Sequence, residues 1–526
     1  MEFVVYHLSF IIFSLLLLWR PLFAGEAFFW GTPLLQFVPW QQLAADMWRS
    51  GHLPLWNPFV GCGAPLAANY QTGAFYPLNV LHLLIPAEVA LSWTVALHLA
   101  LTGWGMHRWG RAIGLNRFPA FVGALALQGS GFLVARAALF PSIALTFPWL
   151  AIWLWRGEAL VQNMRLRNAL SLGFVLGLGL LAGHAQTASY GGLLLAAYLI
   201  FRTLQEAQDR RRATRSRQPD SRAHPLRFTF YVSLLILLSL ILGLGLAAVQ
   251  LLPTAELLMY SQRSTGVRDE IALTYSFWPW RLITFAAPDF FGNPGRGTYW
   301  GYATYWEDAG YVGTLPLLLA AWAVTAAIRA SLKGTDRQSD TRFTFHVLRS
   351  TSRASTSARS LVLFWTSAAL ISFLLALGKN TPLFLFLFRH VPGFDLFKAP
   401  ARWLSVTTLA LAALAAIGAH HWPRGHRERR LGALAVTVGG AMLAGGLVAP
   451  RIISDIPSSF GPATVRLGLT LIFVGALTLL RARMGAGNAP WWYTTVVILI
   501  ALDLLTVGWP LVPTVDRALY QGETVT

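Results

Sequence analysis

The stretch PLWNPFVGCGAPLAANYQTGAFYP, residues 54–77, interrupts an otherwise apolar part of the chain. Proline and glycine recur in it every few residues, so it cannot form a regular helix. It has no charged residue but is dense in aromatic rings and side-chain amides. Apolar runs flank it at 3–22 and 86–106, each near the roughly 20 residues that a helix needs to span a bilayer. The stretch is therefore predicted to be an ordered loop between two membrane-spanning helices.

The composition extends this prediction to the whole chain of 526 residues. Hydrophobic residues make up 55% of it and charged residues 12%, which is typical of a polytopic helical membrane protein. The single cysteine, Cys62, excludes an intrachain disulfide and a cysteine metal cluster. The net charge of +19 gathers in short segments between apolar runs, at 204–227, 329–360 and 423–430. The positive-inside rule places such segments in the cytoplasm, and nucleic-acid binding is not expected.

The predicted fold is an all-α integral membrane protein forming one domain over residues 1–526, with about thirteen transmembrane helices. The apolar stretches are 3–22, 86–106, 117–135, 140–155, 169–184, 187–203, 228–252, 310–328, 361–378, 401–419, 432–450, 464–480 and 493–510. With the N-terminus inside, most lysines and arginines fall on inner loops. The C-terminus and two long loops, 23–85 and 253–309, are then outside. Loops of that length are usually functional or disordered, and these are too aromatic for disorder.

The first outer loop presents uncharged amides and aromatic rings. Amides donate to and accept from hydroxyls, while rings cover the apolar faces of sugars. Taken together, this set predicts a loop that faces a polyhydroxylated ligand. For any single amide, a turn that ties the loop to itself is the favoured alternative. The residues are Gln36, Trp56, Asn57, Asn69 and Gln71.

Charged and polar residues also gather where later segments meet the outer face. Glu307 and Asp308 lie just before the eighth predicted span, beside Tyr311, which is a further candidate for binding the substrate. Partial burial there would raise the pKa of a carboxyl and make it a candidate base, although the carboxylates could equally favour a helix N-terminus.

Three further segments add polar groups at the same face or in the last span. His184 and Gln186 point to the outer face and are candidates for binding the substrate, with a structural histidine as the alternative. Arg263, Lys398 and Arg402 are candidates for binding a lipid phosphate, or ordinary interfacial cations. Asp503 lies within the last span and should have a buried partner.

Several kinds of site have no motif in the sequence. It has no P-loop, no HExxH, no GxSxG and no strong zinc-ligand spacing. No cofactor or metal is predicted from these patterns. A lipid or polysaccharide transporter remains an alternative, but polar residues gather at the outer face rather than through the middle of several spans, as transport would require.

Five motifs taken in order resemble the YfhO family of bacterial multi-pass membrane proteins: PLWNPFVGCGAPLAANYQTGAFYPLN, GHAQTASY, AVQLLPTAELLMYSQRS, YWEDAGYVGTLPLLL and VPGFDLFKAPARW. That family looks like a branch of the GT-C glycosyltransferases. The resemblance implies a protein of the bacterial cytoplasmic membrane. It also implies transfer of a sugar from a polyprenyl-phosphate donor to an outer glycopolymer acceptor. An outer-loop carboxylate would act as base, and cations, or a metal in some members, would stabilise the departing lipid phosphate.

The sequence departs from the family pattern at the acid expected early in the first outer loop. That acid should stand four residues before Gln36 of the QFVP motif, where this chain has Thr32. Asp46 and Glu307 are therefore the candidate catalytic carboxylates. A degenerate, non-catalytic relative is the alternative that the departure raises.

Overall fold

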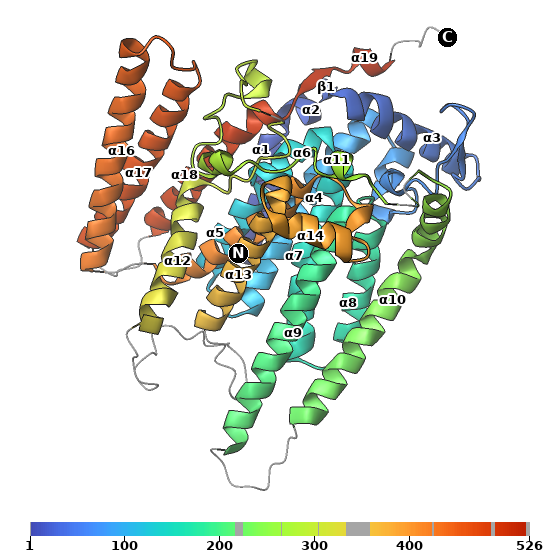
Figure 1. Ribbon diagram of the computed structural model, residues 1–526, viewed down its shortest axis with the longest axis horizontal. Coiled ribbons are helices and arrows are strands. Elements are labelled where there is room, and N and C mark those ends of the chain that lie inside the picture. Colours follow the sequence, from blue (N-terminus) through green and yellow to red (C-terminus); the bar gives the residue numbers. More distant parts are fainter. Residues whose placement is uncertain are drawn as a thin grey trace.

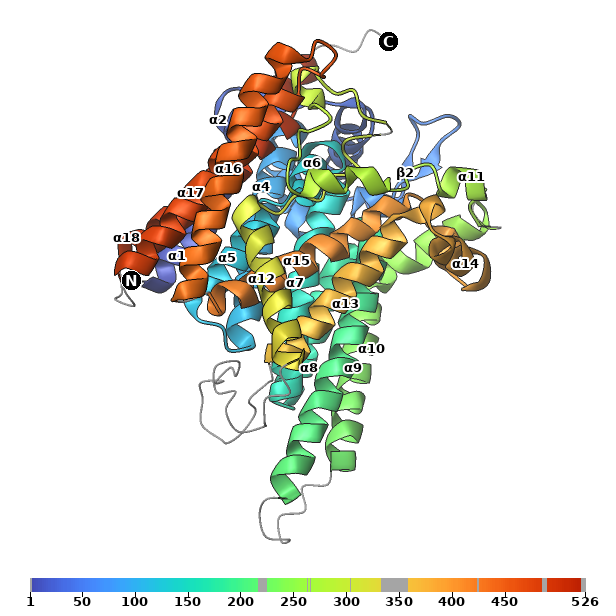
Figure 2. The same ribbon diagram turned by 60° about the vertical axis from the view of Figure 1, so that its left-hand side comes forward.

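The computed structural model describes residues 2–215, 225–262, 264, 266–302, 304–332, 358–422, 425–484 and 490–521. Helices dominate it, and most of the long ones run side by side (Figures 1 and 2). The long helices are α1 (Glu2–Leu17), α4 (Ala87–Ala112), α5 (Arg117–Gln128), α6 (Gly131–Leu139), α7 (Pro141–Gln162), α8 (Leu166–Leu181), α9 (Ala185–Arg215), α10 (Pro225–Met259), α12 (Thr314–Leu332), α13 (Ala358–Ala376), α15 (Leu404–His420), α16 (His426–Ile452), α17 (Phe460–Met484) and α18 (Pro490–Gly508).

Eight helices of the described chain are long and apolar enough to cross a membrane, which makes the protein a multi-pass membrane protein by length and composition. The pair α5 and α6, bent by 41° at residues 129–130, raises this number to nine if the pair is one span. The remaining predicted spans coincide with α7 and with the shorter apolar helices Tyr6–Leu17, Leu166–Leu181 and Thr314–Arg329. The total of thirteen stays a prediction.

The outer surfaces of several helices are apolar, as a lipid environment requires. Helix α10 exposes a row of large side chains along its length, and α16 exposes another. Contiguous exposed apolar surface of this extent marks contact with a membrane or a partner. The exposed residues of α10 include Phe230, Leu234, Leu237, Ile241, Leu244 and Leu252.

Short elements gather toward one end of the bundle and form what we call the crown, residues 23–85, 260–313, 377–403 and 509–521 (upper half of Figures 1 and 2). It contains α3 (Val38–Arg49), α11 (Asp269–Ala272), α14 (Pro382–His390) and α19 (Ala518–Gln521), with α2 (Trp19–Phe23) at its edge. Strand β1 (Glu26–Phe28) pairs antiparallel with β4 (Thr514–Asp516), and β2 (Trp56–Asn57) with β3 (Ala64–Pro65). The β1–β4 pair places the C-terminal segment beside the first long loop, while the predicted outer location of both stays a prediction.

The second long loop begins later than the sequence suggests. Helix α10 continues through Pro253 to Met259, so the loop starts at residue 260 and not at 253. The carbonyl of Val249 loses a hydrogen bond because proline has no N–H. Contacts at the helix end offset this loss: the Gln250 amide donates to the Ala67 carbonyl oxygen at 2.7 Å, and the Thr254 hydroxyl donates to that of Ala68 at 2.9 Å. Helix α9 likewise runs on to Arg215, inside the predicted basic loop 204–227.

Helices α16 and α17 form a hairpin whose backbones approach closely at three glycine pairs. These pairs recur every seven residues: Gly432 with Gly475, Gly439 with Gly468, and Gly446 with Gly461. A Cβ on Gly439 would lie 2.7 Å from the Gly468 carbonyl oxygen, so a side chain there would force the helices apart. Small residues allow this kind of contact between membrane helices. The hairpin stands at one side of the bundle (Figure 1).

Candidate functional site

The crown encloses a buried group of charges, which we call the arginine–glutamate cluster: Arg136, Gln186, Glu307 and Arg402. The Arg136 guanidinium, from α6, donates to Glu307 Oε2 at 2.8 Å. The Arg402 guanidinium donates to Glu307 Oε1 at 2.9 Å through Nη2 and at 3.2 Å through Nε. The side chains of Arg136 and Glu307 are 1% and 6% exposed, so this ionic contact is shielded from water.

Gln186 connects the cluster to the start of helix α9. Its side-chain oxygen accepts from Arg402 Nη1 at 3.0 Å, while its amide nitrogen donates to the Lys398 carbonyl at 2.6 Å and to the Tyr190 hydroxyl at 2.9 Å. The Tyr190 ring stacks on Trp403 with centroids 3.8 Å apart. The GHAQ turn and the KAPARW segment are thus held together by one amide and one ring pair.

The electrostatics of the cluster favour an anion. Although burial opposes ionisation, Arg402 and Arg136 lower the pKa of Glu307 to about 2, so this carboxylate is ionised at neutral pH. Two arginines and one glutamate leave one net positive charge. Burial, followed by the charge of Arg402, holds the pKa of His184 well below its usual value, so this histidine is neutral. A phosphate group has the charge that would balance this excess.

Asp308 and Tyr311 hold the neighbouring loop in place. The Asp308 carboxylate lies 2.7 Å from Arg281 Nη1, and this guanidinium nitrogen also donates to the Tyr299 hydroxyl and the Tyr302 carbonyl. The Tyr311 hydroxyl donates to Asp503 at 2.6 Å, so the carboxylate in the last span has the partner that the sequence predicts. Tyr311 is therefore buried beside α18, away from any open surface.

The pKa of Asp308 predicts how the stability of the folded protein depends on pH. Burial raises this pKa to about 7, even though Arg281 acts in the opposite direction. The folded protein then keeps a proton on Asp308 that the unfolded chain releases near pH 4. Stability should fall as the pH rises from about 4 to about 7, by up to about 1.4 kcal/mol per pH unit for this group.

We expect Asp308→Asn to remove this slope, measured as unfolding midpoints of the purified protein between pH 5 and pH 7. Asp269→Asn is the control, because that carboxylate is exposed and pairs with Arg389 on the surface. An unchanged slope in Asp308→Asn would contradict the assignment.

Thr32, which replaces the acid expected from the resemblance, lies close to the cluster. Its hydroxyl donates to the carbonyl of Leu139, at the end of the helix that carries Arg136. Trp30 packs edge-to-face on Trp306, the residue before Glu307, with centroids 5.8 Å apart. Gln36 is exposed in the π-helical turn Pro33–Phe37, a rare conformation often found at functional sites.

The other predicted residues of the first loop lie outside the cluster. Asp46 is exposed on α3, where it pairs with Arg49 at 2.8 Å and accepts from Gln42. Asn57 accepts from the Phe59 N–H and Asn69 from the Gln71 N–H, so both amides stabilise turns. Trp56 and Gln71 are exposed. Arg263 lies outside the described residues.

A groove of about 570 Å³ runs between the first loop and the end of α10, and we call it the outer groove. The stretch 54–77 forms one wall of it through apolar residues, and Glu256 and Tyr260 of the α10 end line the other. Of the amides and rings predicted to bind sugar, none lines this groove in the described part of the chain. The lining side chains from the first loop are Leu53, Leu55, Pro65, Ala67, Ala68 and Phe75.

The five motifs meet in one connected set of contacts. The first-loop stretch contacts α10 through Gln250 and Thr254, and it reaches the end of α8 through the Tyr70 hydroxyl, which donates to the Leu180 carbonyl. Gln186 joins GHAQ to KAPARW, and Arg402 joins KAPARW to YWEDAGY. Segments separated by up to 216 residues therefore meet at one end of the bundle.

Sequence analysis missed Arg136, the second cation on Glu307. The available signal was its position as a lone charge in the apolar run FLVARAALF. A buried cation in such a run needs an anionic partner, but nothing local indicates which one. Among the described residues, no group of three or more histidine, cysteine, aspartate or glutamate side chains could hold a metal ion.

No protein-family model and no curated protein matches the sequence. Among solved structures, the chain is similar to the arabinofuranosyltransferase AftD from Mycobacteria, with a TM-score of 0.48 and 14% identity over 98% of this chain. It is also similar to ArnT from Cupriavidus metallidurans, solved with undecaprenyl phosphate bound, with a TM-score of 0.45 and 13% identity over 96% of this chain. The chain spans 27% of the length of AftD and 76% of that of ArnT. At these TM-scores and identities, a shared activity does not follow.

Proposed function

We propose that the protein is a GT-C-like membrane glycosyltransferase of the YfhO type. It would transfer a sugar from a polyprenyl-phosphate donor to an extracytoplasmic acceptor, a cell-wall or envelope glycopolymer. The observation that carries the proposal is the convergence of three of the five motifs, GHAQTASY, YWEDAGYVGTLPLLL and VPGFDLFKAPARW, on the arginine–glutamate cluster. Burying a charged side chain costs free energy unless the charge is paired or has a function. Segments that serve only to span a membrane do not need such buried charges at one end of the bundle.

The proposed donor site combines the cluster with the outer groove. Arg402 and Lys398 would attract the lipid phosphate, because the cluster has one uncompensated positive charge. The apolar lining of the outer groove would accept part of the polyprenyl chain. The exposed rings and amides near it, Trp56 and Gln71, remain candidates for the sugar or the acceptor.

The two adjacent carboxylates of the YWEDAGY motif are proposed to have different roles. Glu307 stays ionised and accepts from both arginines, so it positions them and cannot readily take a proton. The pKa of Asp308 lies near neutrality, where a general base is most effective. Asp308 would therefore receive the proton of the acceptor hydroxyl after the loop around it opens. Asp46 has no described contact with the cluster and is the weaker candidate.

The test is transfer from radiolabelled undecaprenyl-phosphate sugars in membranes that contain wild type, Asp308→Asn, Asp46→Asn or Asp269→Asn. General base catalysis typically contributes 10²–10⁴-fold, so we expect Asp308→Asn to lose about that much and the Asp269→Asn control to keep its rate. Loss of transfer in Asp46→Asn alone would identify Asp46, on α3, as the base. No transfer by wild type with any donor, in membranes that supply an acceptor, would contradict the proposal.

One observation favours a second candidate, a non-catalytic relative. The cluster is closed: Glu307 and Gln186 have their polar atoms satisfied within the protein, and the acid expected in the first loop is Thr32. In that case the cluster would only hold the crown together. Stability would then depend on Glu307, while no carboxylate substitution would change transfer above background.

A further inference from the structure

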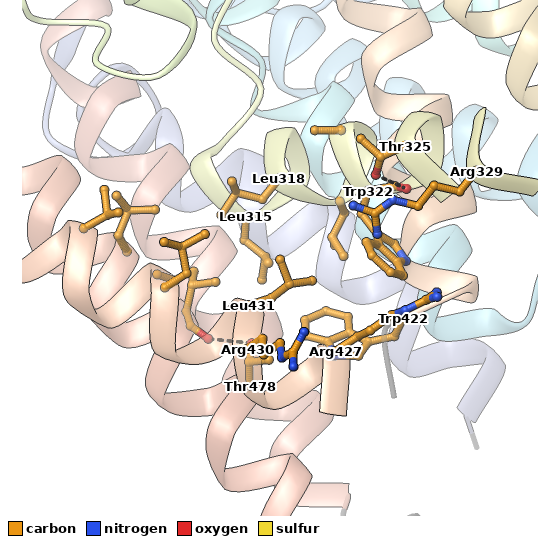
Figure 3. A pocket seen from close by; sticks show the side chains of 17 residues that line it. Leu315, Leu318, Trp322, Thr325, Arg329, Trp422, Arg427, Arg430, Leu431 and Thr478 are labelled. Carbon is orange, nitrogen blue, oxygen red and sulfur yellow. Dashed lines mark hydrogen bonds between the residues drawn. The ribbon is translucent and has the colours of Figure 1, made fainter. Parts of the chain in front are cut away.

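A groove that the proposed function does not use runs along α12, from its first turn to its last. It has a volume of about 610 Å³ and lies between α12 and the α16–α17 hairpin. Apolar side chains from all three helices line most of it, together with Trp422 (Figure 3). The glycine pairs hold α16 against α17, and Gly418 allows α12 to approach α15 closely on its other side. The helices on both sides of the groove are thus held by their other neighbours.

Three arginines stand at one end of this groove. Arg329 comes from the last turn of α12, and Arg427 and Arg430 come from the first turns of α16, so they face the same end from opposite walls (Figure 3). All three are exposed, and within the described residues none forms an ion pair. The nearby carboxylate, Glu428, is buried and directed to Arg481 of α17 at 3.7 Å. Among the residues that the structure describes, no carboxylate therefore balances the positive charge at this end of the groove.

The position of the arginines defines which half of the membrane the groove faces. Helix α12 starts at Thr314, beside Tyr311 and the crown. Leu315 and Arg329 both line the groove and are roughly 21 Å apart along the helix, at 1.5 Å per residue. The arginine end is joined to the basic segments 329–360 and 423–430, which the positive-inside rule assigns to the cytoplasm. The groove thus runs from that surface toward the crown.

We propose that this groove binds an anionic glycerophospholipid of the cytoplasmic leaflet. The phosphodiester headgroup would lie among Arg329, Arg427 and Arg430, and an acyl chain would follow the apolar walls. Basic pockets between membrane helices on that side bind anionic headgroups, and such lipids are abundant there. This choice is favoured over a polyprenyl-phosphate donor, whose proposed phosphate site is at the opposite end of α12. The basic, apolar-walled groove is observed independently of the proposed glycosyltransferase activity, and only the choice between these two lipids rests on the proposed donor site.

The experiment measures binding of phosphatidylglycerol to the purified, delipidated full-length protein by native mass spectrometry. Each arginine near a headgroup contributes about 1 kcal/mol, which corresponds to about fivefold in affinity. We therefore expect the double variant Arg427→Gln/Arg430→Gln to bind about 25-fold more weakly. Arg429→Gln is the matched control, because this exposed arginine lies on the same helix but does not line the groove. Its affinity should stay within about twofold of wild type.

A second variant tests the apolar part without changing charge. Ala435 lines the groove, and Ala435→Phe would fill the space for the chain. We expect it to weaken phosphatidylglycerol binding while the protein keeps its unfolding temperature. Equal binding of phosphatidylcholine, or unchanged binding in both groove variants, would overturn the proposal. Tighter binding of undecaprenyl phosphate at the same arginines would also overturn it and assign the groove to the lipid carrier.

Discussion

Glu307→Gln is expected to destabilise the protein by about 3–5 kcal/mol and to abolish any transfer activity. The substitution keeps the shape of the side chain but removes the negative charge between Arg136 and Arg402. Two guanidinium groups would then face each other in a site almost closed to water, and an uncompensated buried charge costs about this much. The measurement is the thermal unfolding of wild type and variant in detergent, with the size-exclusion profile of the protein after heating to each temperature as the readout.

A double variant separates the loss of charge balance from other effects. Arg136→Met/Glu307→Gln removes one buried cation together with the anion, so it should recover a large part of the stability lost in Glu307→Gln. The control is Asp269→Asn, which breaks the exposed pair with Arg389 and should cost no more than about 1 kcal/mol. If the double variant were as unstable as the sum of its single variants, the two groups would not be coupled and the ionic explanation would fail.

The pH dependence of Glu307 has the opposite sign to that of Asp308. The pKa of Glu307 is lowered to about 2, below the value near 4.3 of an unfolded glutamate. Its contribution is therefore complete above about pH 4.3 and is lost as the pH falls toward 2. The contribution of these two carboxylates to the stability of the wild type should therefore be largest near pH 4–5 and should decline at lower and at higher pH. Glu307→Gln should lose only the acidic branch.

Much of the architecture could be predicted because it depends on local signals. Apolar runs of about 20 residues specify membrane helices, and proline, glycine and amides in 54–77 specify an ordered loop. Pro253 made the predicted end of α10 too early. The helix continues beyond this proline because tertiary contacts from Gln250 and Thr254 to the first loop stabilise it. The β1–β4 pair was missed for a similar reason: its short strands are nearly 500 residues apart and have no strong local pattern.

The candidate site was predictable in its parts but not in its connections. The residue types in GHAQ, YWEDAGY and KAPARW indicate polar chemistry at the outer face, and the structure brings Gln186, Glu307 and Arg402 together. That Arg136 would complete the group could not be read from the sequence, since it lies 171 residues from Glu307. The roles of Asn57 and Asn69 also depend on turns whose backbone geometry the sequence does not specify.

Arg202→Leu is expected to have an effect as large as that of Glu307→Gln, at the opposite end of the bundle. The Glu158 carboxylate accepts from Arg202 Nε at 2.8 Å and from Nη2 at 2.7 Å, and also from the Tyr198 hydroxyl and the Gln162 amide. The side chains of Glu158 and Arg202 are 0% and 2% exposed. Removing the guanidinium leaves a buried carboxylate with neutral donors alone, which should cost about 3–5 kcal/mol.

Thermal unfolding in detergent should show that the double variant Glu158→Gln/Arg202→Leu recovers most of the stability lost in Arg202→Leu, because no unpaired charge remains at this buried site. Glu206→Gln is the matched control: Glu206 pairs with Arg210 further along α9, where the arginine is 33% exposed, and the loss should stay below about 1 kcal/mol. An Arg202→Leu variant that does not accumulate in membranes, beside a double variant that does, would support the same conclusion. Equal losses in the single and double variants would instead mean that Arg202 acts through the packing and other contacts of its guanidinium group, because that group is absent from both.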